Sequence, residues 1–191
     1  MTGMLSKHRS SQVSRRPSRK GGAKANNGQA IRIGVIADTH GLFDRAILRH
    51  FTGVDHILHA GDIGDRSILK QLEAIAPVTA VSGNVDGYGK SGVKAEKLID
   101  LAGKRIAIRH ILYEGGKLTK EGRVFLDREQ PDVCIFGHTH QSKIEWFGST
   151  LLFNPGSAGP KRFKLQRGLG VLTIKNGAIT PTHIGLDDRP E

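Results

Sequence analysis

Five short apolar runs, each ending in polar residues, place the strongest constraint on what this chain can fold into. The runs are rich in Ile, Val and Ala, and they cover residues 31–37, 57–60, 78–81, 106–109 and 133–136. Apolar runs of roughly four to eight residues are typical of strands that are buried on both faces. We therefore expect an α/β protein in which these five segments are sheet strands.

Short polar motifs that contain Asp, Asn or His follow all five runs. In order along the chain they are Asp38 and His40, then Gly61 and Asp62, then Gly83 and Asn84, then His110, and finally Gly137, His138 and His140. Sites in open α/β sheets lie just beyond the carboxyl ends of the strands. The sequence therefore predicts that these side chains gather at one site.

The residue types suit a site for two divalent ions. Two ions held about 3.5–4 Å apart require a shared carboxylate and a set of imidazole, carboxylate and amide ligands. Asp62 is the natural bridging carboxylate, while Asp38, His40 and His140 could complete one metal site and Asn84, His110 and His138 the other. Alternate residues of an extended segment point the same way, so we expect the pairs 38/40 and 138/140 each to converge.

The order of these motifs, followed by Asn154, Pro155, Gly156 and Ser157, resembles the calcineurin-like metallophosphoesterases. Within that superfamily the chain is most similar to the small phosphodiesterases of the YfcE type, to which the retromer subunit Vps29 is related. The resemblance runs from about residue 31 to about residue 185. It implies an α/β fold in four layers, in which two β-sheets pack as a sandwich flanked by helices and the metals lie at one edge.

The resemblance also implies the ligands and the cofactors. Seven residues fall on the family's metal-ligand positions, namely Asp38, His40, Asp62, Asn84, His110, His138 and His140. The cofactors would be two divalent metal ions, with manganese expected first and nickel, cobalt, zinc or iron as alternatives. His59, three residues before Asp62, could support a ligand through a hydrogen bond.

The expected reaction is hydrolysis of a phosphodiester by a hydroxide held between the two metals. The candidate catalytic residues are Asp62, Asn84, Asp86 and His138, and the candidate substrate-binding residues are Asn84, Ser157 and Arg162. Competing interpretations are a tight turn for Ser157 and solvated surface for Arg162 and its neighbour Lys161. The expected partner is a phosphodiester substrate, either a small molecule or a nucleotide.

Two positions depart from the family pattern. Val85, followed by Asp86, stands where larger phosphatases of the superfamily have a His that acts as general acid. Without that acid the site favours esters whose leaving group needs little protonation, unless Asp86 or a metal-bound water donates the proton. Ile111 and Leu112 replace a Gly-His pair after His110, and a bulky residue there changes the substrate side of the pocket.

Two other kinds of function stay open. One is a phosphomonoesterase or a dinucleotide polyphosphatase of the same superfamily, although the absence of a His after Asn84 favours the diester. The other is a non-catalytic scaffold for protein interactions. Vps29 has that role with an altered ligand set, whereas the set is intact in this chain, which favours catalysis.

The positive charge of the chain is concentrated in its first 29 residues. The net charge is +11, and residues 1–29 contain seven Lys or Arg and no Asp or Glu. This stretch is rich in Ser, Gly and Arg and has no periodic apolar face, so we expect a disordered extension before a single domain over residues 30–191. Three interpretations compete: an inert extension or misplaced start, an arm that contacts nucleic acid or another polyanion, and an organelle-targeting peptide.

We expect a cytoplasmic protein without a membrane span. No apolar run approaches the length that crosses a bilayer. Cys134 is the single cysteine of the chain, so no internal disulfide can form, which fits a reducing compartment. Exposed strands could pair two copies into a homodimer.

Helices and hairpins are predicted between and after the five runs. Helical spacing covers residues 44–51, where Asp44 is placed to cap, residues 66–75, and residues 117–128. Paired strands are expected at residues 95–100 and 104–109. Hairpins are expected about residues 148–149 and about the Asn-Gly pair at residues 176–177.

Overall fold

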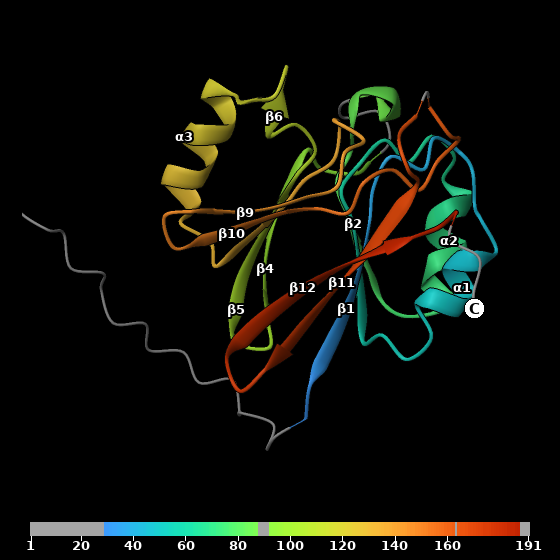
Figure 1. Cartoon of the computed structure of the whole chain (residues 1–191), viewed down its shortest axis with the longest axis horizontal. Helices are drawn as coiled ribbons and strands as arrows, with labels where there is room; N and C mark the ends of the chain where they lie inside the picture. Colours follow the sequence, from blue (N-terminus) through green and yellow to red (C-terminus); the bar gives the residue numbers. More distant parts are fainter. Residues whose placement is uncertain (1–28, 88–91, 163, 188–191) are drawn as a thin grey trace, which may run out of the picture.

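Two five-stranded β-sheets lie face to face in the part of the chain that the structure describes (Figure 1). The structure is a computed structural model, and it describes residues 29–87, 92–162 and 164–187. The first sheet contains β1 (Ile31–Ile36), β2 (His56–His59), β3 (Val78–Ala80), β11 (Gly168–Lys175) and β12 (Ala178–Gly185), in the order β12-β11-β1-β2-β3. The second contains β4 (Glu96–Leu101), β5 (Lys104–Arg109), β8 (Val133–Ile135), β9 (Lys143–Phe147) and β10 (Thr150–Asn154), in the order β4-β5-β8-β10-β9.

Helices cover the two outer faces of this sandwich. Helices α1 (Ala46–His50) and α2 (Ser67–Glu73) lie beside the first sheet, and α3 (Lys120–Glu129) lies on the second (Figure 1). A short hairpin of β6 (Tyr113–Glu114) and β7 (Lys117–Leu118) and a 3-10 turn, η1 (Asn84–Asp86), complete the described elements. The four-layer α/β sandwich that the sequence predicts is therefore confirmed.

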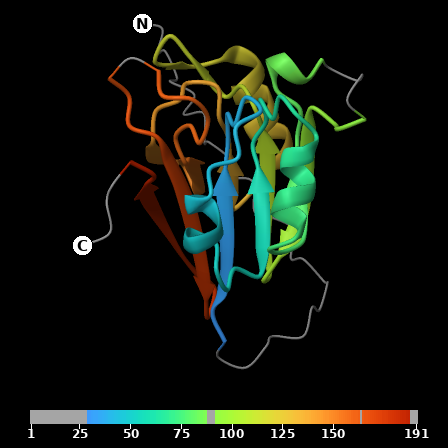
Figure 2. The same ribbon diagram turned by 90° about the vertical axis from the view of Figure 1, so that its right-hand side faces the viewer.

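The parallel strands of both sheets carry the chain toward one end of the sandwich. In the first sheet β1, β2 and β3 are parallel, with Val35 opposite Leu58. In the second sheet β5, β8 and β10 are parallel. Figure 2 shows β1 and β2 running side by side in the same direction. The polar motifs that follow these strands consequently meet at a single edge.

Three apolar layers hold the elements together. On β1, Ile33 and Val35 point into the core between the sheets, whereas Ile36 packs with the apolar residues of α1 and α2. Gly34 lies opposite the ring of Phe51, and a Cβ at this glycine would come within 3.1 Å of that ring. Burying one large apolar side chain contributes roughly 1.5–3 kcal/mol. Because alternate residues of β1 point to opposite sides, the strand buries apolar side chains on both faces of the sheet, which stabilises both packing layers.

A third apolar layer joins α3 to the second sheet. Phe125 and Leu126 of the helix pack against Cys134 and Leu152 of the strands. Cys134 is fully buried, and burial raises the pKa of its thiol. This residue therefore belongs to the core.

The predicted helices are present with small changes of boundary. The helix predicted over residues 44–51 begins at Ala46, whose backbone N–H donates to Asp44 Oδ1 over 2.8 Å. The helix predicted over residues 117–128 begins at Lys120, because residues 117–118 form β7. Thr119 caps this helix by accepting a hydrogen bond from the backbone N–H of Gly122.

Both predicted hairpins are also present. β9 pairs antiparallel with β10, and β11 pairs antiparallel with β12. Asn176 and Gly177 link the second pair with φ values of 50° and 80°. Positive φ at both central residues is the signature of the type I′ turn that Asn-Gly favours.

In the described ranges, no helix has the length and apolar content needed to span a bilayer. The basic extension, over which disorder and nucleic-acid contact are predicted, lies outside the described residues except for its last position.

Candidate metal centre

Four of the predicted ligand residues lie together at the carboxyl ends of β1, β2 and β8. One ligand atom from each of Asp38, His40, Asp62 and His140 lies within 4.8 Å of all the others. Asp38 is fully buried, and Asp62 and His140 are 5% and 8% exposed. These are the three residues predicted for the first metal, together with the predicted bridging carboxylate.

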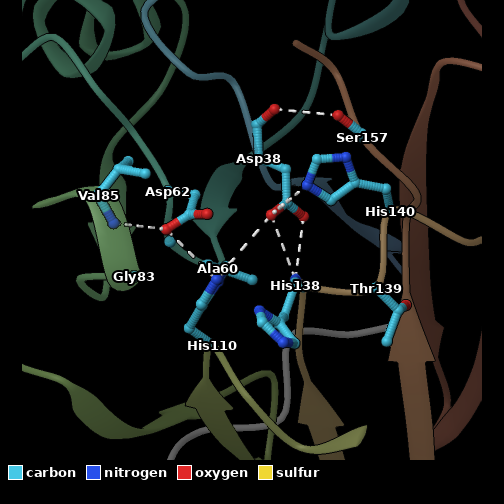
Figure 3. A network of polar contacts seen from close by, with 12 residues as sticks. Asp38, Ala60, Asp62, Gly83, Val85, His110, His138, Thr139, His140 and Ser157 are labelled. Atoms are coloured by element: carbon cyan, nitrogen blue, oxygen red, sulfur yellow. Dashed lines mark hydrogen bonds and ion pairs between the residues drawn. The ribbon is translucent and has the colours of Figure 1, made fainter. Parts of the chain in front are cut away.

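The residues predicted for the second metal lie on the other side of Asp62. His110 Nε2 is 3.3 Å from Asp62 Oδ1, and the rings of His110 and His138 meet edge to face with centroids 5.5 Å apart. Asn84 begins η1, and the next backbone N–H, that of Val85, donates to Asp62 Oδ1 over 3.1 Å. Figure 3 shows Asp62 between Val85 and His110.

The hydrogen bonds of His110 indicate how its ring is oriented. Its Nδ1 is 2.7 Å from the carbonyl oxygen of Ala60, and a carbonyl oxygen only accepts, so Nδ1 carries the proton. In the neutral ring, Nε2 therefore presents a lone pair toward Asp62. This buried atom has no hydrogen-bond partner. A lone pair facing a carboxylate at this distance is stable only if a proton or a cation lies between them.

The same arrangement recurs on the first side of the site. His40 Nε2 is 3.3 Å from His140 Nε2, and His140 Nε2 is 3.3 Å from Asp38 Oδ1. Imidazole nitrogens and carboxylate oxygens are ligands that first-row divalent metals accept. The set of donor atoms and their close spacing therefore fit divalent cations.

The electrostatics of the site also favour positive charge. Burial acts to raise the pKa of Asp62, but its interaction with the nearby His110 ring, together with the Val85 N–H and His40, outweighs burial and lowers this pKa to about 2. Burial acts to lower the pKa of His110, but the carboxylates of Asp62 and Asp38 outweigh it and raise this pKa. Each group stabilises the charged form of the other.

The backbone of the ligand segments is not extended, and the prediction about the pairs 38/40 and 138/140 is wrong in this respect. Five ligand residues have positive φ values: Asp38 (54°), His40 (47°), Asp62 (55°), His138 (69°) and His140 (57°). The left-handed region costs an L-residue roughly 1–2 kcal/mol, and such strain is concentrated at functional sites. The side chains converge because the backbone turns sharply at each ligand.

Glycines allow the ligand loops to approach one another closely. A Cβ at Gly83 would lie 2.2 Å from Asp62 Oδ1, and a Cβ at Gly137 would lie 2.8 Å from Asp38 Oδ2. With Gly at position 137, the backbone N–H of His138 reaches both carboxylate oxygens of Asp38 at 3.2 Å (Figure 3). The glycines in these motifs therefore have a steric role.

His59 and Thr39 form a buried link behind the ligands. The backbone N–H of Gly61 donates to His59 Nδ1, so the ring proton is on Nε2, which lies 3.0 Å from Thr39 Oγ1. The Thr39 hydroxyl in turn donates to the carbonyl of Ile63 over 2.9 Å. Burial lowers the pKa of His59 to about 4, which keeps the ring neutral. The link joins the loop of Asp38 to the loop of Asp62, as the position of His59 in the sequence suggested.

Ser157 and Asn154 also support the ligand loops. The Ser157 hydroxyl donates to the carbonyl of Asp38 over 3.0 Å and is 5% exposed (Figure 3). Asn154 donates to the carbonyl of Gly137 over 2.9 Å. These contacts agree with the tight-turn interpretation of Ser157 and do not favour its contact with a substrate phosphate. In the sequence, only the place of Asn154 in the Asn-Pro-Gly-Ser motif could have indicated this hydrogen bond.

Asp86 is engaged with the backbone. Its carboxylate accepts hydrogen bonds from the N–H groups of Ile63, Gly64 and Gly83 at 3.1, 2.9 and 2.7 Å. Its neighbour Val85 is 54% exposed and has no proton to donate. This geometry indicates a structural role for Asp86 and disagrees with the expectation that Asp86 donates a proton to the leaving group.

Lys161 and Arg162 have different surroundings. A terminal nitrogen of Arg162 is 3.3 Å from His40 Nε2, at the margin of the metal centre. Lys161 instead pairs with Asp187 over 3.4 Å. The structure therefore brings only the second residue of this basic pair to the site.

Ile111 and Leu112 connect His110 to β6. Leu112 is fully buried with the apolar residues beneath that helix. The Arg109 side chain donates to the carbonyl of Ile111 over 2.9 Å. The replacement of Gly-His thus contributes to packing beside His110.

Comparisons with known proteins agree with this fold. The family model described as the calcineurin-like phosphoesterase superfamily domain matches residues 31–177. The protein named probable metallophosphoesterase MJ0623, from Methanocaldococcus jannaschii, is 35% identical over 147 residues, which cover 73% of this chain and 74% of that protein.

Solved structures share the fold at lower identity. A structure described as a novel archaeal phosphodiesterase superposes with a TM-score of 0.66 at 21% identity, covering 82% of this chain and 100% of that chain. Zinc-bound wild-type Vps29 from Entamoeba histolytica gives a TM-score of 0.62 at 18% identity, covering 81% of this chain and 99% of that chain. The family model spans most of the sandwich together with its ligand loops. The chain therefore belongs to the calcineurin-like phosphoesterase superfamily.

Proposed function

We propose that this protein is a metal-dependent phosphodiesterase with two divalent ions, manganese being the first candidate. The observation that carries the proposal is the cluster of Asp38, His40, Asp62 and His140, whose ligand atoms lie within 4.8 Å of one another, with the buried His110 Nε2 facing the Asp62 carboxylate at 3.3 Å. The superfamily is metal-dependent, and the archaeal structure with the same fold is described as a phosphodiesterase.

The protein would hold one ion with Asp38, His40 and His140, the other with Asn84, His110 and His138, and both with Asp62. When bound, such ions supply Lewis-acid chemistry: they acidify a water molecule and neutralise negative charge on the phosphate.

Arg162 supports substrate binding in this proposal. Its guanidinium lies beside His40 Nε2, and guanidinium groups pair with phosphate oxygens through two parallel hydrogen bonds. Arg162 is exposed, so a phosphate can reach it from solvent. We assign it to orienting the phosphate and offsetting its charge.

The surroundings of Asn84 favour a diester with an acidic leaving alcohol. Val85 offers no proton, and the carboxylate of Asp86 is held by three backbone N–H groups. A poor leaving group needs protonation as it departs, whereas a good one does not. For this reason we propose diester hydrolysis ahead of the phosphomonoesterase and dinucleotide polyphosphatase alternatives.

The test compares bis(p-nitrophenyl) phosphate with p-nitrophenyl phosphate as substrates of the manganese-loaded protein. The proposal predicts a higher kcat/KM for the diester, and loss of both activities in Asp62→Ala. Asp65→Ala is the matched control, because Asp65 is exposed on the adjacent loop, where its carboxylate accepts a hydrogen bond from the backbone N–H of Ser67. A higher kcat/KM for the monoester would favour the phosphomonoesterase.

A scaffold is the second candidate, because Vps29 shares the fold. It predicts a folded chain that binds a partner protein and hydrolyses neither ester with any of manganese, cobalt, nickel, zinc or iron. The cytoplasmic location, the homodimer and the nucleic-acid contact of the basic extension stay predictions.

A further inference from the structure

A cavity of about 500 Å³ opens directly beside the candidate metal centre. His138 and Thr139 form its wall on the metal side, and the β6-β7 turn at Gly115 and Gly116 forms the opposite rim. Its volume lies in the range of roughly 300–1,000 Å³ that is usual for small-molecule sites. A diester whose phosphate lies at the metal centre would place one of its two alcohol groups in this cavity.

The charges along the cavity disfavour a second anionic group. Lys143 is the cationic side chain of the described lining, and its Nζ is 2.8 Å from Glu145 Oε2, so its charge is already paired. The Glu114 carboxylate stands at the entrance, with Oε1 3.7 Å from His138 Nε2 and its side chain 73% exposed. A second phosphate in the cavity would meet Glu114 without a free cation to offset it.

The aromatic residue of the cavity offers little surface for stacking a base. Tyr113 is 7% exposed, and its ring stacks on Phe136 with centroids 5.4 Å apart. The Lys143 ammonium lies 4.9 Å from the centre of the same ring. The Tyr113 hydroxyl donates to Glu145 over 2.9 Å. The ring is therefore covered by packing and by the ammonium group.

Hydrogen-bonding groups remain available along the cavity. Gln141 and Ser142 are exposed residues of its wall, and Glu114 has a carboxylate that accepts hydrogen bonds. The Ser142 hydroxyl donates to the carbonyl of Pro155 over 3.3 Å, so toward the cavity it can only accept. Carboxylate and amide groups are suited to binding the hydroxyl groups of a polyol or a sugar. The described lining thus combines polar neutral groups with the largely exposed Glu114 carboxylate beside His138, and its one Lys is already paired.

We propose that this cavity binds the alcohol group of the diester, and that this group is a polyol or sugar with several hydroxyls and no second anionic group. The proposal rests on the phosphodiesterase function and adds the substrate class. Glu114 and Gln141 are the specificity-determining residues in it.

The test uses two diesters with the same p-nitrophenyl leaving group, one with a glyceryl group and the other with a propyl group. The shared leaving group keeps the chemistry constant. The ratio of the two kcat/KM values therefore measures how strongly the cavity prefers the glyceryl group over the propyl group. We expect the manganese-loaded protein to prefer the glyceryl ester by about tenfold, the effect of one or two hydroxyl hydrogen bonds. Adding a phosphate to the glyceryl group should remove the preference.

Two variants test whether Glu114 and Gln141 in the cavity cause the preference for the glyceryl ester. Glu114→Gln removes the charge, and Gln141→Trp fills the cavity; we expect each to lower the glyceryl-to-propyl ratio by about fivefold or more. Thr180→Trp adds the same indole at an exposed position of β12 and should retain the wild-type ratio. Metal content and thermal unfolding of each variant separate loss of the cavity from loss of the fold.

The outcomes distinguish this proposal from the proposed function. Equal kcat/KM for the two esters, or a ratio unchanged in both cavity variants, would overturn the polyol assignment and leave the phosphodiesterase intact. If the protein hydrolyses neither ester, the proposed function fails. Calorimetric titration with glycerophosphoglycerol and with dipropyl phosphate then tests the cavity alone, and equal Kd values would refute it.

Discussion

The carboxylate of Asp86 accepts a hydrogen bond from the backbone N–H of Gly83 over 2.7 Å and thereby holds the turn that begins at Asn84. The same carboxylate accepts from Ile63 and Gly64, which directly follow Asp62. Asp86 is therefore a positioning residue that joins two of the ligand loops.

Replacing Asp86 with Asn should weaken metal binding and lower activity equally on esters with good and poor leaving groups. The amide nitrogen of Asn cannot accept, so the variant leaves N–H donors unsatisfied and loses about 2 kcal/mol of stability. Rates on bis(p-nitrophenyl) phosphate and on diphenyl phosphate measure the leaving-group effect. A loss confined to the phenyl ester would show that Asp86 is the general acid. Asp65→Asn is the control, because its Oδ1 can still accept from the backbone of Ser67.

His59 should make the stability of the metal-free protein depend on pH. Burial lowers the pKa of His59 to about 4 from the 6.5 of an exposed ring. The contribution of the neutral His59 ring to the free energy of unfolding is complete above pH 6.5. It is lost as the pH falls toward 4, because in this range His59 takes up a proton in the unfolded chain but not in the folded one. Wild type should therefore lose about 2 kcal/mol more than His59→Gln between pH 7 and pH 5.

Urea unfolding at several pH values, with a chelator present, measures this difference. Between about pH 7.5 and pH 8.5 the stability difference between wild type and His59→Gln should stay constant. The same slope for both proteins below pH 6.5 would mean that His59 is charged in the folded state, contrary to the link through Thr39.

Because the backbone at His40 is left-handed, a Gly variant at this position should be more stable than an Ala variant, which reverses the usual order of stability. At a φ of 47°, a Cβ is strained, so metal-free His40→Gly should be more stable than His40→Ala by about 1 kcal/mol. In a strand the order is the opposite, and at Thr180 of β12 Gly should be less stable than Ala by roughly 0.5–1 kcal/mol. Chemical denaturation of the four variants provides the comparison. Equal stability of the two His40 variants would refute strain at this ligand.

Arg162 should contribute to substrate binding, and its neighbour Lys161 should not. Arg162→Ala removes the guanidinium beside His40 and should lower kcat/KM for the diester by about 10- to 100-fold, the effect of a charged hydrogen bond. Arg162→Lys should restore part of the loss, since a point charge remains. Lys161→Ala breaks only the pair with Asp187 and should change kcat/KM by less than about twofold. Equal losses in the two Ala variants would mean that overall charge, and not position, matters.

The family resemblance was sufficient to predict the four layers, and the apolar runs were sufficient to predict the convergence of the ligand residues. Apolar runs identify buried strands, and parallel strands bring the motifs at their carboxyl ends to one edge. Asp38 and His110, far apart in the chain, could be placed together on this basis. Asn176 and Gly177 likewise predict their turn, because few residues tolerate positive φ.

Other features could not be predicted because they depend on backbone groups or burial. The N–H donors of Ile63 and Gly64 lie 22 or more residues from Asp86, and a backbone N–H is the same in almost every residue type. Asp38 and His138 have left-handed φ values because the loops close around the site, and this closure depends on the folded structure and not on the residue types. Similarly, the difference between Lys161 and Arg162 depends on where Asp187 lies in space.

The most direct test of the central claim is to measure manganese bound per chain together with hydrolysis of bis(p-nitrophenyl) phosphate, in wild type and in Asp62→Ala. Metal-stripped protein is titrated with manganese by equilibrium dialysis, and bound metal is quantified by elemental analysis. We predict two ions per wild-type chain, and weaker metal binding with activity lowered by about 1,000-fold or more in Asp62→Ala. A wild-type chain that binds no divalent metal, or an Asp62→Ala variant with full metal-dependent hydrolysis, would contradict the account.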